Sequence, residues 1–337
     1  MNYPKVTVLM PVYNAEKYVG EAIESILNQT FRDFEFLIIN DGSTDSSLDV
    51  VQYYKDPRIK LVNNEKNLGL SNTLNKGIDL AQGEYLARMD ADDISLRERL
   101  KKQVGFMDSH PDIGICGSWI QIFDELGNRN IGYYPPSHDE LLCSLFYNSC
   151  FAHPTVMIRR QIIEESYMRF DGTYCPAEDY YFWLNLLKIT NGANLQEILL
   201  RYRLSKTQMT SKAAEVIFYA NKTRFKILND LGIKLNDEQK ELHSIILNET
   251  WIKSIDFFKK VINWLEIISE ANQAQRKLPE PLFTQTLSKF LFYRSLLHES
   301  STLNTYNLYK KSKLSSFYKP KLYDVLKLRI KGWIKFW

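Results

Sequence analysis

The sequence predicts an α/β fold, a mostly parallel sheet with helices on both faces, followed by a mainly α-helical C-terminal region. Three observations lead to this prediction. Over about the first 200 residues, short apolar runs alternate with helical patterns across short links, which is typical of βαβ units. The run at residues 34–39 is too uniformly apolar for a strand with one solvated face. Beyond about residue 210, Gly and Pro become rare and the pattern stays helical, so we expect domains at residues 1–210 and 211–337.

The elements follow from apolar spacing. Apolar side chains recur with a 3.6-residue period from Tyr18 to Leu27, which indicates an amphipathic helix, and a similar stripe begins at Leu70. Strands are expected at residues 5–10, 34–39, 59–62, 84–88 and 155–158. Helices are expected at residues 18–27, 44–54, 70–81, 96–107, 217–231, 239–270 and 282–309.

The composition excludes several classes of protein. Hydrophobic residues make up 45% of the 337 residues and charged residues 25%, which are ordinary globular values and exclude a collagen-like or disordered chain. The 4 cysteines form no CxxC pair, which argues against a zinc module and a disulfide scaffold and suits a reducing compartment. No apolar run approaches the roughly 18 residues of a membrane span, and no signal peptide is evident. We therefore expect a cytoplasmic protein.

Acidic residues follow three of the predicted strands. The first strand leads into Pro11-Val12-Tyr13, the second into Asp41, and the fourth into Asp90-Ala91-Asp92-Asp93. The strand ends carry neither a GxGxxG nor a GxxxxGK[ST] loop, so a dinucleotide site and a P-loop are not indicated. Because ligands of parallel sheets bind beyond the carboxyl ends of the strands, these acids are expected on one rim. Acids repel a bare phosphate, but Asp-x-Asp offers hard oxygen ligands for Mg²⁺ or Mn²⁺.

Structural explanations of the same residues stay open. Asp93 and Ser95 could cap the following helix, and Asp41-Gly42-Ser43 could be only a turn. Taken alone, Asp-x-Asp is a weak motif. The placement of acids after three strands is what favours a site.

These motifs resemble family 2 glycosyltransferases of the GT-A fold. The resemblance rests on VTVLMPVYNAEKYVG, FEFLIINDGSTDSS, NEKNLGLSNTLNKG and GEYLARMDADD, in this order. It is strong over about residues 4–125, persists to about 210 and fades in the helical region. The resemblance implies an inverting transfer that uses a nucleotide-sugar donor, a UDP-sugar in many members, and a divalent metal. It implies no particular sugar.

The resemblance also implies roles for individual residues. Asp41 would contact the base, Asp90 would lie near the ribose and Asp92 would ligate the metal. The nucleotide would also be held by Pro11, Val12, Tyr13 and Asn67. Many members carry an arginine seven residues after that asparagine, where this chain has Leu74, and Lys76 is the nearby candidate to replace it.

A catalytic base is expected later in the chain. Inversion needs a carboxylate that removes the proton of the acceptor hydroxyl. The segment that contains Glu178-Asp179 resembles the Glu-Asp motif of the family, which makes Asp179 the base and Glu178 a supporting acid. Both acids would also suit the positive end of a helix dipole. Trp183 and the leucines after it are expected in the core.

Two further segments resemble contacts to the diphosphate or the acceptor. His153-Pro154 matches a His-Pro pair that the family often has near the donor diphosphate, although a lone histidine is more often structural. Near residue 205, members often carry a histidine two residues after an arginine. This chain has Ser205 after Arg203, so charge at that loop would have to come from Arg203 or Lys206.

The C-terminal tail is basic and aromatic. Residues 308–337 hold nine Lys and Arg side chains and one acid, so the tail carries +8 while the formal net charge of the chain is only +3. Apolar residues recur at helical spacing from Leu322 to Trp337, with Lys327, Lys331 and Lys335 beside them. This pattern favours a helix on an anionic membrane, which suits a lipid-linked saccharide acceptor as in bacterial surface-polysaccharide assembly. A helix packed on the protein's own core is the alternative, and nucleic acid is not indicated because the body is acidic.

Two other functions stay open at this stage. A sugar nucleotidyltransferase would share a similar sheet, but it should carry a glycine-rich basic loop where this chain has PVYNAEKY. A catalytically silent, membrane-associated nucleotide-sugar-binding protein would have no need of all four acids Asp41, Asp90, Asp92 and Asp179. Binding of a donor without turnover would favour it.

Overall fold

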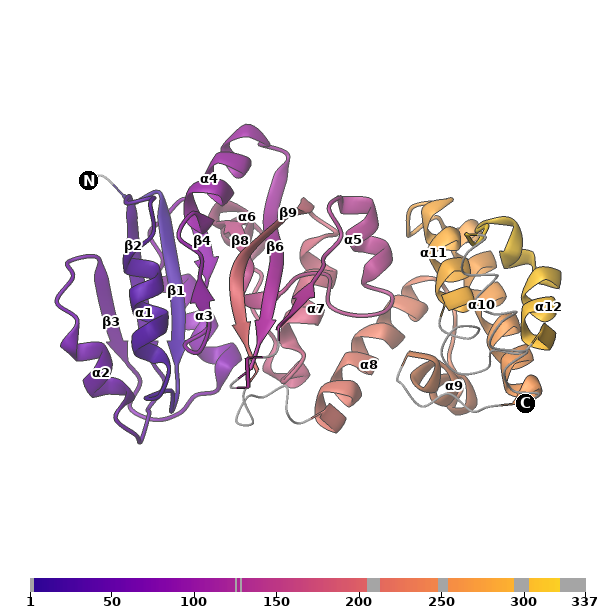
Figure 1. Cartoon of the computed structure of the whole chain (residues 1–337), viewed down its shortest axis with the longest axis horizontal. Helices are drawn as coiled ribbons and strands as arrows, with labels where there is room; N and C mark the ends of the chain where they lie inside the picture. Colours follow the sequence, from indigo (N-terminus) through magenta and orange to yellow (C-terminus); the bar gives the residue numbers. More distant parts are fainter. Residues whose placement is uncertain are drawn as a thin grey trace. The chain divides into compact units, whose positions relative to one another are not determined.

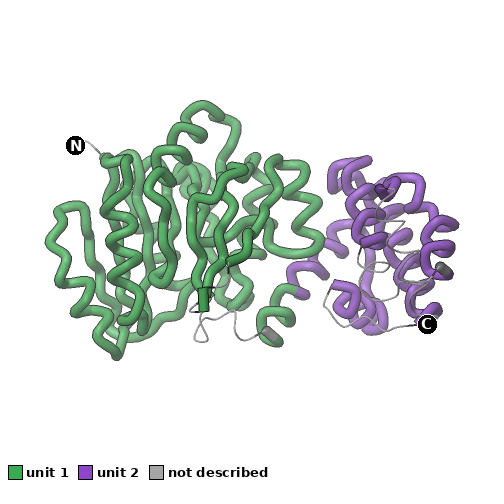
Figure 2. Tube along the Cα trace, viewed as in Figure 1, with its two compact units in different colours: residues 1–220 green, residues 221–337 purple. Residues whose placement is uncertain are grey.

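The chain forms two compact units, residues 1–220 and 221–337 (Figure 2). The computed structural model describes residues 3–124, 126–127, 129–204, 213–247, 254–293 and 303–321. The expected domain boundary after residue 210 lies outside the described residues, as do Ser205 and Lys206. Helix α8 (Ala213–Asp230) runs from the first unit into the second.

The first unit is built on a nine-stranded sheet with the order β3-β2-β1-β4-β8-β6-β9-β5, and β7 pairs with β6 (Figure 1). The strands β1, β2, β3 and β4 are parallel, as expected. The strands are β1 (Val6–Val12), β2 (Phe34–Asn40), β3 (Ile59–Asn63), β4 (Tyr85–Arg88), β5 (Ile94–Ser95), β6 (Ile113–Phe123), β7 (Arg129–Gly132), β8 (Met157–Arg159) and β9 (Asn191–Arg203).

Helices cover both faces of this sheet. Alternate strand residues such as Val8 and Met10 pack against α1, α2 and α4, and the intervening residues such as Leu9 face α3, α6 and α7. Every residue of β2 is buried, the polar residues Glu35 and Asn40 included, which explains its mainly apolar sequence. The helices are α1 (Val19–Leu27), α2 (Ser47–Tyr53), α3 (Leu70–Leu80), α4 (Arg99–Ser109), α5 (His138–Ser144), α6 (Arg160–Ser166) and α7 (Glu178–Leu186), with short 3-10 turns η1 (His153–Thr155) and η2 (Gly172–Tyr174).

The α/β fold class is confirmed, but the sheet is more mixed than expected. The pairs β4–β8, β6–β8, β6–β7 and β5–β9 are antiparallel, and β6 and β9 form a parallel pair of their own. The long strands β6 and β9 were not anticipated. Their pairing joins segments far apart in the sequence, and local periodicity does not encode such pairs.

The second unit is helical among its described residues. It contains the end of α8 with α9 (Asp237–Leu247), α10 (Ile255–Gln275), α11 (Leu282–Phe290), α12 (Leu303–Lys311) and the 3-10 turn η5 (Lys313–Ser316). The single helix expected at residues 239–270 is represented by two, α9 and α10. The apolar stripe of the tail, from Leu322 onward, lies outside the described residues. None of the described helices is both long and apolar enough to cross a bilayer.

Candidate active site

The nucleotide-binding residues expected from the sequence lie at the ends of β1 and β2. The backbone N–H of Asp41 donates to the Val12 carbonyl across 2.8 Å, so the two strand ends adjoin. The Val12 side chain is buried in the core, while Pro11 is partly exposed and the Tyr13 ring is 49% exposed at the rim. A ligand at this edge would therefore meet the Tyr13 ring and, at Val12, only backbone.

Asp41 holds the loop that leads into α3. Its carboxylate accepts hydrogen bonds from the Leu68 and Gly69 backbone N–H groups at 2.9 and 3.0 Å, and from the Asn64 amide at 2.7 Å. Asn67 lies in the same loop, is exposed, and accepts from the Gly69 N–H at 2.8 Å. Asp41 is 3% exposed, and these three hydrogen bonds use three of the roughly four acceptor sites of a carboxylate.

Lys76 reaches this network, and Leu74 does not. The Lys76 Nζ donates to Asn64 Oδ1 at 2.6 Å, and the Asn64 amide in turn donates to Asp41. Leu74 is only 1% exposed and belongs to the core. The structure therefore links a lysine to Asp41 by way of Asn64, a buried residue that the sequence analysis did not single out.

The segment after β4 gathers three carboxylates. One oxygen from each of Asp90, Asp92 and Asp93 lies within 4.8 Å of the others, close enough for a single divalent cation. Asp93 is buried, and its pKa is raised well above its ordinary value, first by loss of solvent and then by the charges of Asp90 and Asp92. The Asp93 Oδ2 atom has no hydrogen-bond partner among the described residues. Crowded hard oxygen donors with an unpartnered acceptor fit a Mg²⁺ or Mn²⁺ ion.

Arg203, at the end of β9, fixes this segment. Its backbone N–H donates to Asp93 Oδ1 at 2.8 Å and its Nε donates to the Asp92 carbonyl at 2.7 Å. Its guanidinium also pairs with Glu21. The idea that Asp93 or Ser95 caps the next helix is wrong, because α4 begins only at Arg99 and Ser95 lies in β5.

Glu178 and Asp179 open helix α7. Glu178 is 3% exposed, and burial, followed by the Asp179 charge, raises its pKa to about 7. Asp179 is partly exposed, and loss of solvent raises its pKa against the opposing effects of the Tyr180 N–H and Arg88. Ser149 Oγ lies 3.5 Å from the second Asp179 oxygen. Asp179 is thus the more exposed acid of the pair, and Trp183 and the leucines after it are buried as expected.

His153 lies in an aromatic cluster. Its ring centroid is 5.4 Å from that of Phe170 and 5.5 Å from that of Trp183. Burial first, and then the charge of Arg88, lower the pKa of His153 well below its ordinary value. The imidazole is therefore neutral at pH 7 and would meet a diphosphate as a hydrogen-bonding group without charge.

Comparison with known proteins decides the family. The model of glycosyl transferase family 2 matches residues 7–167. An uncharacterized glycosyltransferase of Haemophilus influenzae is 34% identical over 279 residues, which cover 77% of this chain and 84% of that protein. The chain belongs to glycosyl transferase family 2. It is therefore a glycosyltransferase, as its motifs predicted, and the sugar nucleotidyltransferase and silent binding protein are set aside.

Two further matches bear on fold and chemistry. The Escherichia coli protein WfgD, named as a UDP-Glc:α-D-GlcNAc-diphosphoundecaprenol β-1,3-glucosyltransferase, is 30% identical over 229 residues, 67% of this chain and 85% of that protein. The structure of the Pyrobaculum calidifontis mannosyltransferase PcManGT in complex with GDP-Man and Mn²⁺ aligns with a TM-score of 0.54 at 16% identity, covering 98% of this chain and 88% of that one. The second match supports the GT-A fold.

The structure also adds residues to the site that the sequence analysis missed. Arg88, the last residue of β4, pairs with Asp90, and its charge lowers the pKa of both Glu178 and Asp179. Tyr134 lies near enough to Asp179 for its own pKa to be raised by that charge, after burial. Arg88 could have been noticed in the sequence, because a charged residue at the end of a buried strand is unusual. No local sequence pattern distinguishes Tyr134.

Proposed function

We propose that this enzyme transfers a hexose from a UDP-sugar to a hydroxyl of a lipid-linked saccharide, with inversion at the anomeric carbon. The observation that carries the proposal is the cluster of Asp90, Asp92 and Asp93 at the end of β4 in a chain of this family. Asp92, with its two neighbours, would hold Mn²⁺ or Mg²⁺, and the charge of that ion stabilises the departing diphosphate. The Mn²⁺ complex of PcManGT supports this choice of ion.

Asp41 and its loop would bind the uracil base, with Tyr13 at the rim and the backbone at Pro11 and Val12 beside it. Asp90 would lie near the ribose. Lys76, linked to Asp41 through Asn64, adds a positive charge at this edge. Asn67, His153 and Arg203 remain proposed contacts, and Arg203 would act mainly by holding the Asp92–Asp93 backbone in place.

Asp179 would act as the general base. As the acceptor oxygen forms its bond to the anomeric carbon, the bond from that carbon to the diphosphate oxygen breaks on the opposite face, and UDP leaves. The acceptor proton passes to Asp179 and then to solvent. Burial raises the pKa of Asp179 toward neutral pH, and a carboxylate with a higher pKa is a stronger base. Glu178, the supporting acid, would position the acceptor.

The acceptor and the location are inferred from two features. WfgD, a relative of this chain, is named for transfer to a diphosphoundecaprenol-linked sugar, which is a lipid-linked acceptor. The tail at residues 308–337 carries +8, which suits contact with an anionic membrane at its cytoplasmic face. Nucleic acid is not proposed as a partner.

The test is a transfer assay with the full chain, UDP-glucose and GlcNAc-diphosphate-lipid, in Mn²⁺ and in EDTA. We expect a β-linked product from the α-linked donor, formed in Mn²⁺ alone. An α-linked product would contradict inversion at the anomeric carbon. Turnover in EDTA would contradict the dependence on a divalent metal. Release of the corresponding nucleoside diphosphate by slow donor hydrolysis, measured separately with UDP-, dTDP- and GDP-sugars, tests the donor independently of the acceptor. Preference for GDP- or dTDP-sugars would overturn the proposed donor.

A further inference from the structure

Helix α3 is tied to the nucleotide-binding rim at two points. Gly69, the N-cap of α3, donates its backbone N–H to the Asp41 carboxylate at 3.0 Å. Farther along the helix, Lys76 donates to Asn64 at 2.6 Å, and the amide of Asn64 donates to Asp41 at 2.7 Å. These contacts fix the place of α3 relative to Asp41.

Asn75, the neighbour of Lys76 on α3, binds the backbone of a segment far away in the sequence. Its Nδ2 donates to the Phe170 carbonyl at 2.9 Å, and its Oδ1 accepts from the Phe170 N–H at 2.8 Å. Phe170 belongs to no helix or strand, so its backbone groups need partners of another kind. A side-chain amide has the same kinds of donor and acceptor as a peptide group, so Asn75 pairs with Phe170 as a neighbouring strand would.

The side chain of Phe170 continues this contact to helix α7. It is 7% exposed, and its ring stacks on that of Phe182 with 4.2 Å between the centroids and 16° between the planes. The Trp183 ring meets it edge-on, with 6.2 Å between the centroids. Phe182 and Trp183 stand three and four residues after Asp179, about one helical turn away. Because such aromatic pairs prefer a defined geometry, the position of Phe170 bears on the position of the start of α7.

The turn η2 also lies against α3. A Cβ added at Gly172, the first residue of η2, would lie 3.8 Å from the Cβ of Ser71 in the first turn of α3. Arg169 and Asp79 form an ion pair between the same two parts of the chain, but both are exposed and the pair contributes little. Residues 169–177, here called the bridging segment, thus connect α3 with the start of α7.

We propose that Asn75 is a positioning residue that sets the place of Asp179 relative to the nucleotide-binding rim. Through its two hydrogen bonds to Phe170, α3 holds the bridging segment, and the Phe170 ring in turn packs against α7. One helix thereby fixes both the loop bound by Asp41 and the carboxylate that receives the acceptor proton. The inference rests on the proposed function only in the roles given to Asp41 and Asp179.

The first experiment measures amide hydrogen exchange by mass spectrometry in the full chain without ligand. Asn75→Ala keeps α3, because the site is partly exposed and Ala favours a helix, but it removes both hydrogen bonds to the bridging segment. We expect peptides that cover residues 169–183 to exchange about tenfold faster than in the wild type, because this segment opens more readily. Asn75→Asp keeps an acceptor for the Phe170 N–H and should exchange at a rate between the two.

Asn72→Ala is the matched control on the same helix. Asn72 is exposed, and its amide donates to the Leu68 carbonyl at 2.8 Å, near the start of α3. Its loss should leave the exchange of residues 169–183 as in the wild type. Unchanged exchange of these residues in Asn75→Ala, or equally fast exchange in Asn72→Ala, would overturn the inference.

The second experiment separates positioning from a general loss of stability. A base misplaced by about 1 Å can slow the chemical step on the order of a hundredfold. Asn75→Ala should therefore lower kcat for transfer by roughly tenfold to a hundredfold, with the dissociation constant of UDP nearly unchanged. Asn75→Asp should recover part of the lost kcat.

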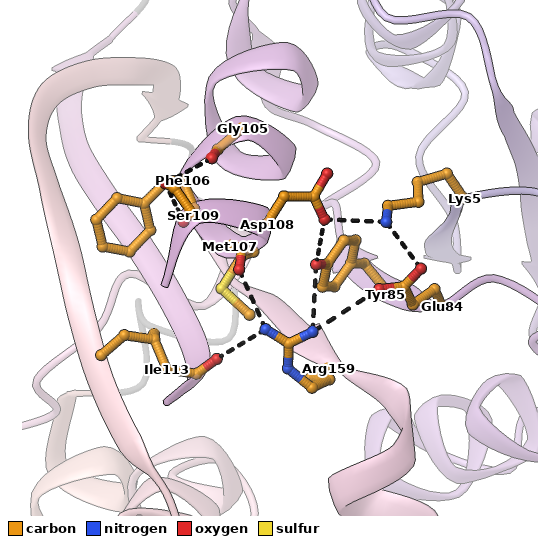
Figure 3. A network of polar contacts seen from close by, with 10 residues as sticks. All are labelled: Lys5, Glu84, Tyr85, Gly105, Phe106, Met107, Asp108, Ser109, Ile113 and Arg159. Atoms are coloured by element: carbon orange, nitrogen blue, oxygen red, sulfur yellow. Dashed lines mark hydrogen bonds and ion pairs between the residues drawn. The ribbon is translucent and has the colours of Figure 1, made fainter. Parts of the chain in front are cut away.

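Arg159→Met is the control for stability. Arg159 ends β8 and lies in a different polar network, with Glu84, Tyr85 and the Met107 and Ile113 carbonyls (Figure 3). Its loss should lower the unfolding midpoint and leave kcat unchanged. Wild-type kcat in Asn75→Ala, or an equal loss of kcat in Arg159→Met, would overturn the positioning role. A wild type that transfers no sugar from any UDP-sugar would contradict the proposed function, and the exchange experiment would still decide whether Asn75 holds the segment before Asp179.

Discussion

Asp179 and Glu178 are adjacent in the sequence but differ in what surrounds them. Glu178 is 3% exposed and its Oε2 has no hydrogen-bond partner among the described residues, whereas Asp179 is partly exposed and lies near Ser149. A group that takes a proton from a substrate must be reachable by it. The difference in exposure is the physical reason to assign the base to Asp179.

Asp179→Asn should therefore remove transfer while leaving the nucleotide site intact. General bases contribute roughly 10²- to 10⁴-fold to rates, so we expect a loss of that order in kcat with little change in the affinity for UDP. Radiolabelled transfer and calorimetric UDP binding measure the two quantities. Asp237→Asn is the control, because its side chain is 99% exposed and lies in the second unit. Wild-type turnover by Asp179→Asn would show that the base lies elsewhere.

Glu178 should make stability depend on pH. Its folded pKa of about 7 lies above the ordinary value of 4.5, so the folded protein binds more protons than the unfolded chain between these values. Stability should accordingly fall as the pH rises from about 4.5 to 7 and level off above, by an amount on the order of 3 kcal/mol. Glu178→Gln should remove this part of the slope. Urea unfolding at both ends of the range measures it, and parallel profiles for wild type and variant would contradict the assignment.

At the scale of elements, the site depends on loops that pack against one another. Gly42, after β2, has a φ of +67°, and a Cβ there would lie 2.6 Å from the backbone of Lys66. The turn after β2 can therefore approach the loop before α3 only because residue 42 lacks a side chain. The Asp41 hydrogen bonds to that loop depend on this approach.

Gly42→Ala should push the two loops apart. We expect a loss of about 1–3 kcal/mol in stability and weaker UDP binding, because both strain and the Asp41 contacts are affected. Gly105→Ala is the matched control: Gly105 lies on helix α4 with nothing within 4 Å of a Cβ, so it should gain about 0.5–1 kcal/mol. Thermal unfolding and calorimetry measure both. Equal stability and UDP affinity in the Gly42 variant and the wild type would contradict the packing argument.

Much of the first unit could be predicted because its signals are local. The apolar stripe of α1 and the mainly apolar run of β2 mark these elements without any tertiary information, and parallel strands bring Asp41 and Asp90 to one edge of the sheet. The pairing of β6 with β9 and the short β5 could not be read in this way, because they depend on contacts between distant segments. The contacts of Asn64, Lys76 and Arg88 could not be predicted either, because their partners lie in other segments of the chain.

At the scale of the whole molecule, charge is unevenly distributed. The tail at residues 308–337 carries +8 in a chain whose formal net charge is +3. Lys310, Lys311, Lys319 and Lys321 are exposed in its described part. Such a distribution favours binding to an anionic surface through one end of the chain.

Replacing Lys327, Lys331 and Lys335 by serine should weaken binding to vesicles that contain phosphatidylglycerol. At about 1 kcal/mol for each lysine, the affinity should fall roughly a hundredfold, as measured by co-sedimentation. The control replaces Lys240, Lys259 and Lys260, which pair with acids in the second unit. A tail variant that binds as tightly as the wild type would point to a tail packed on the protein, and binding that salt does not weaken would contradict attraction by charge.

The most direct test of a metal-dependent nucleotide site is thermal unfolding with UDP in Mn²⁺ and in EDTA, for the wild type and Asp92→Asn. UDP at about 100 times its dissociation constant should stabilise the wild type by about 2.7 kcal/mol, which raises the midpoint by several degrees. The account predicts this rise in Mn²⁺ and its loss both in EDTA and in Asp92→Asn. A rise of the same size in EDTA, or in the variant, would contradict a metal held by Asp92, and no rise in the wild type would contradict the UDP site itself.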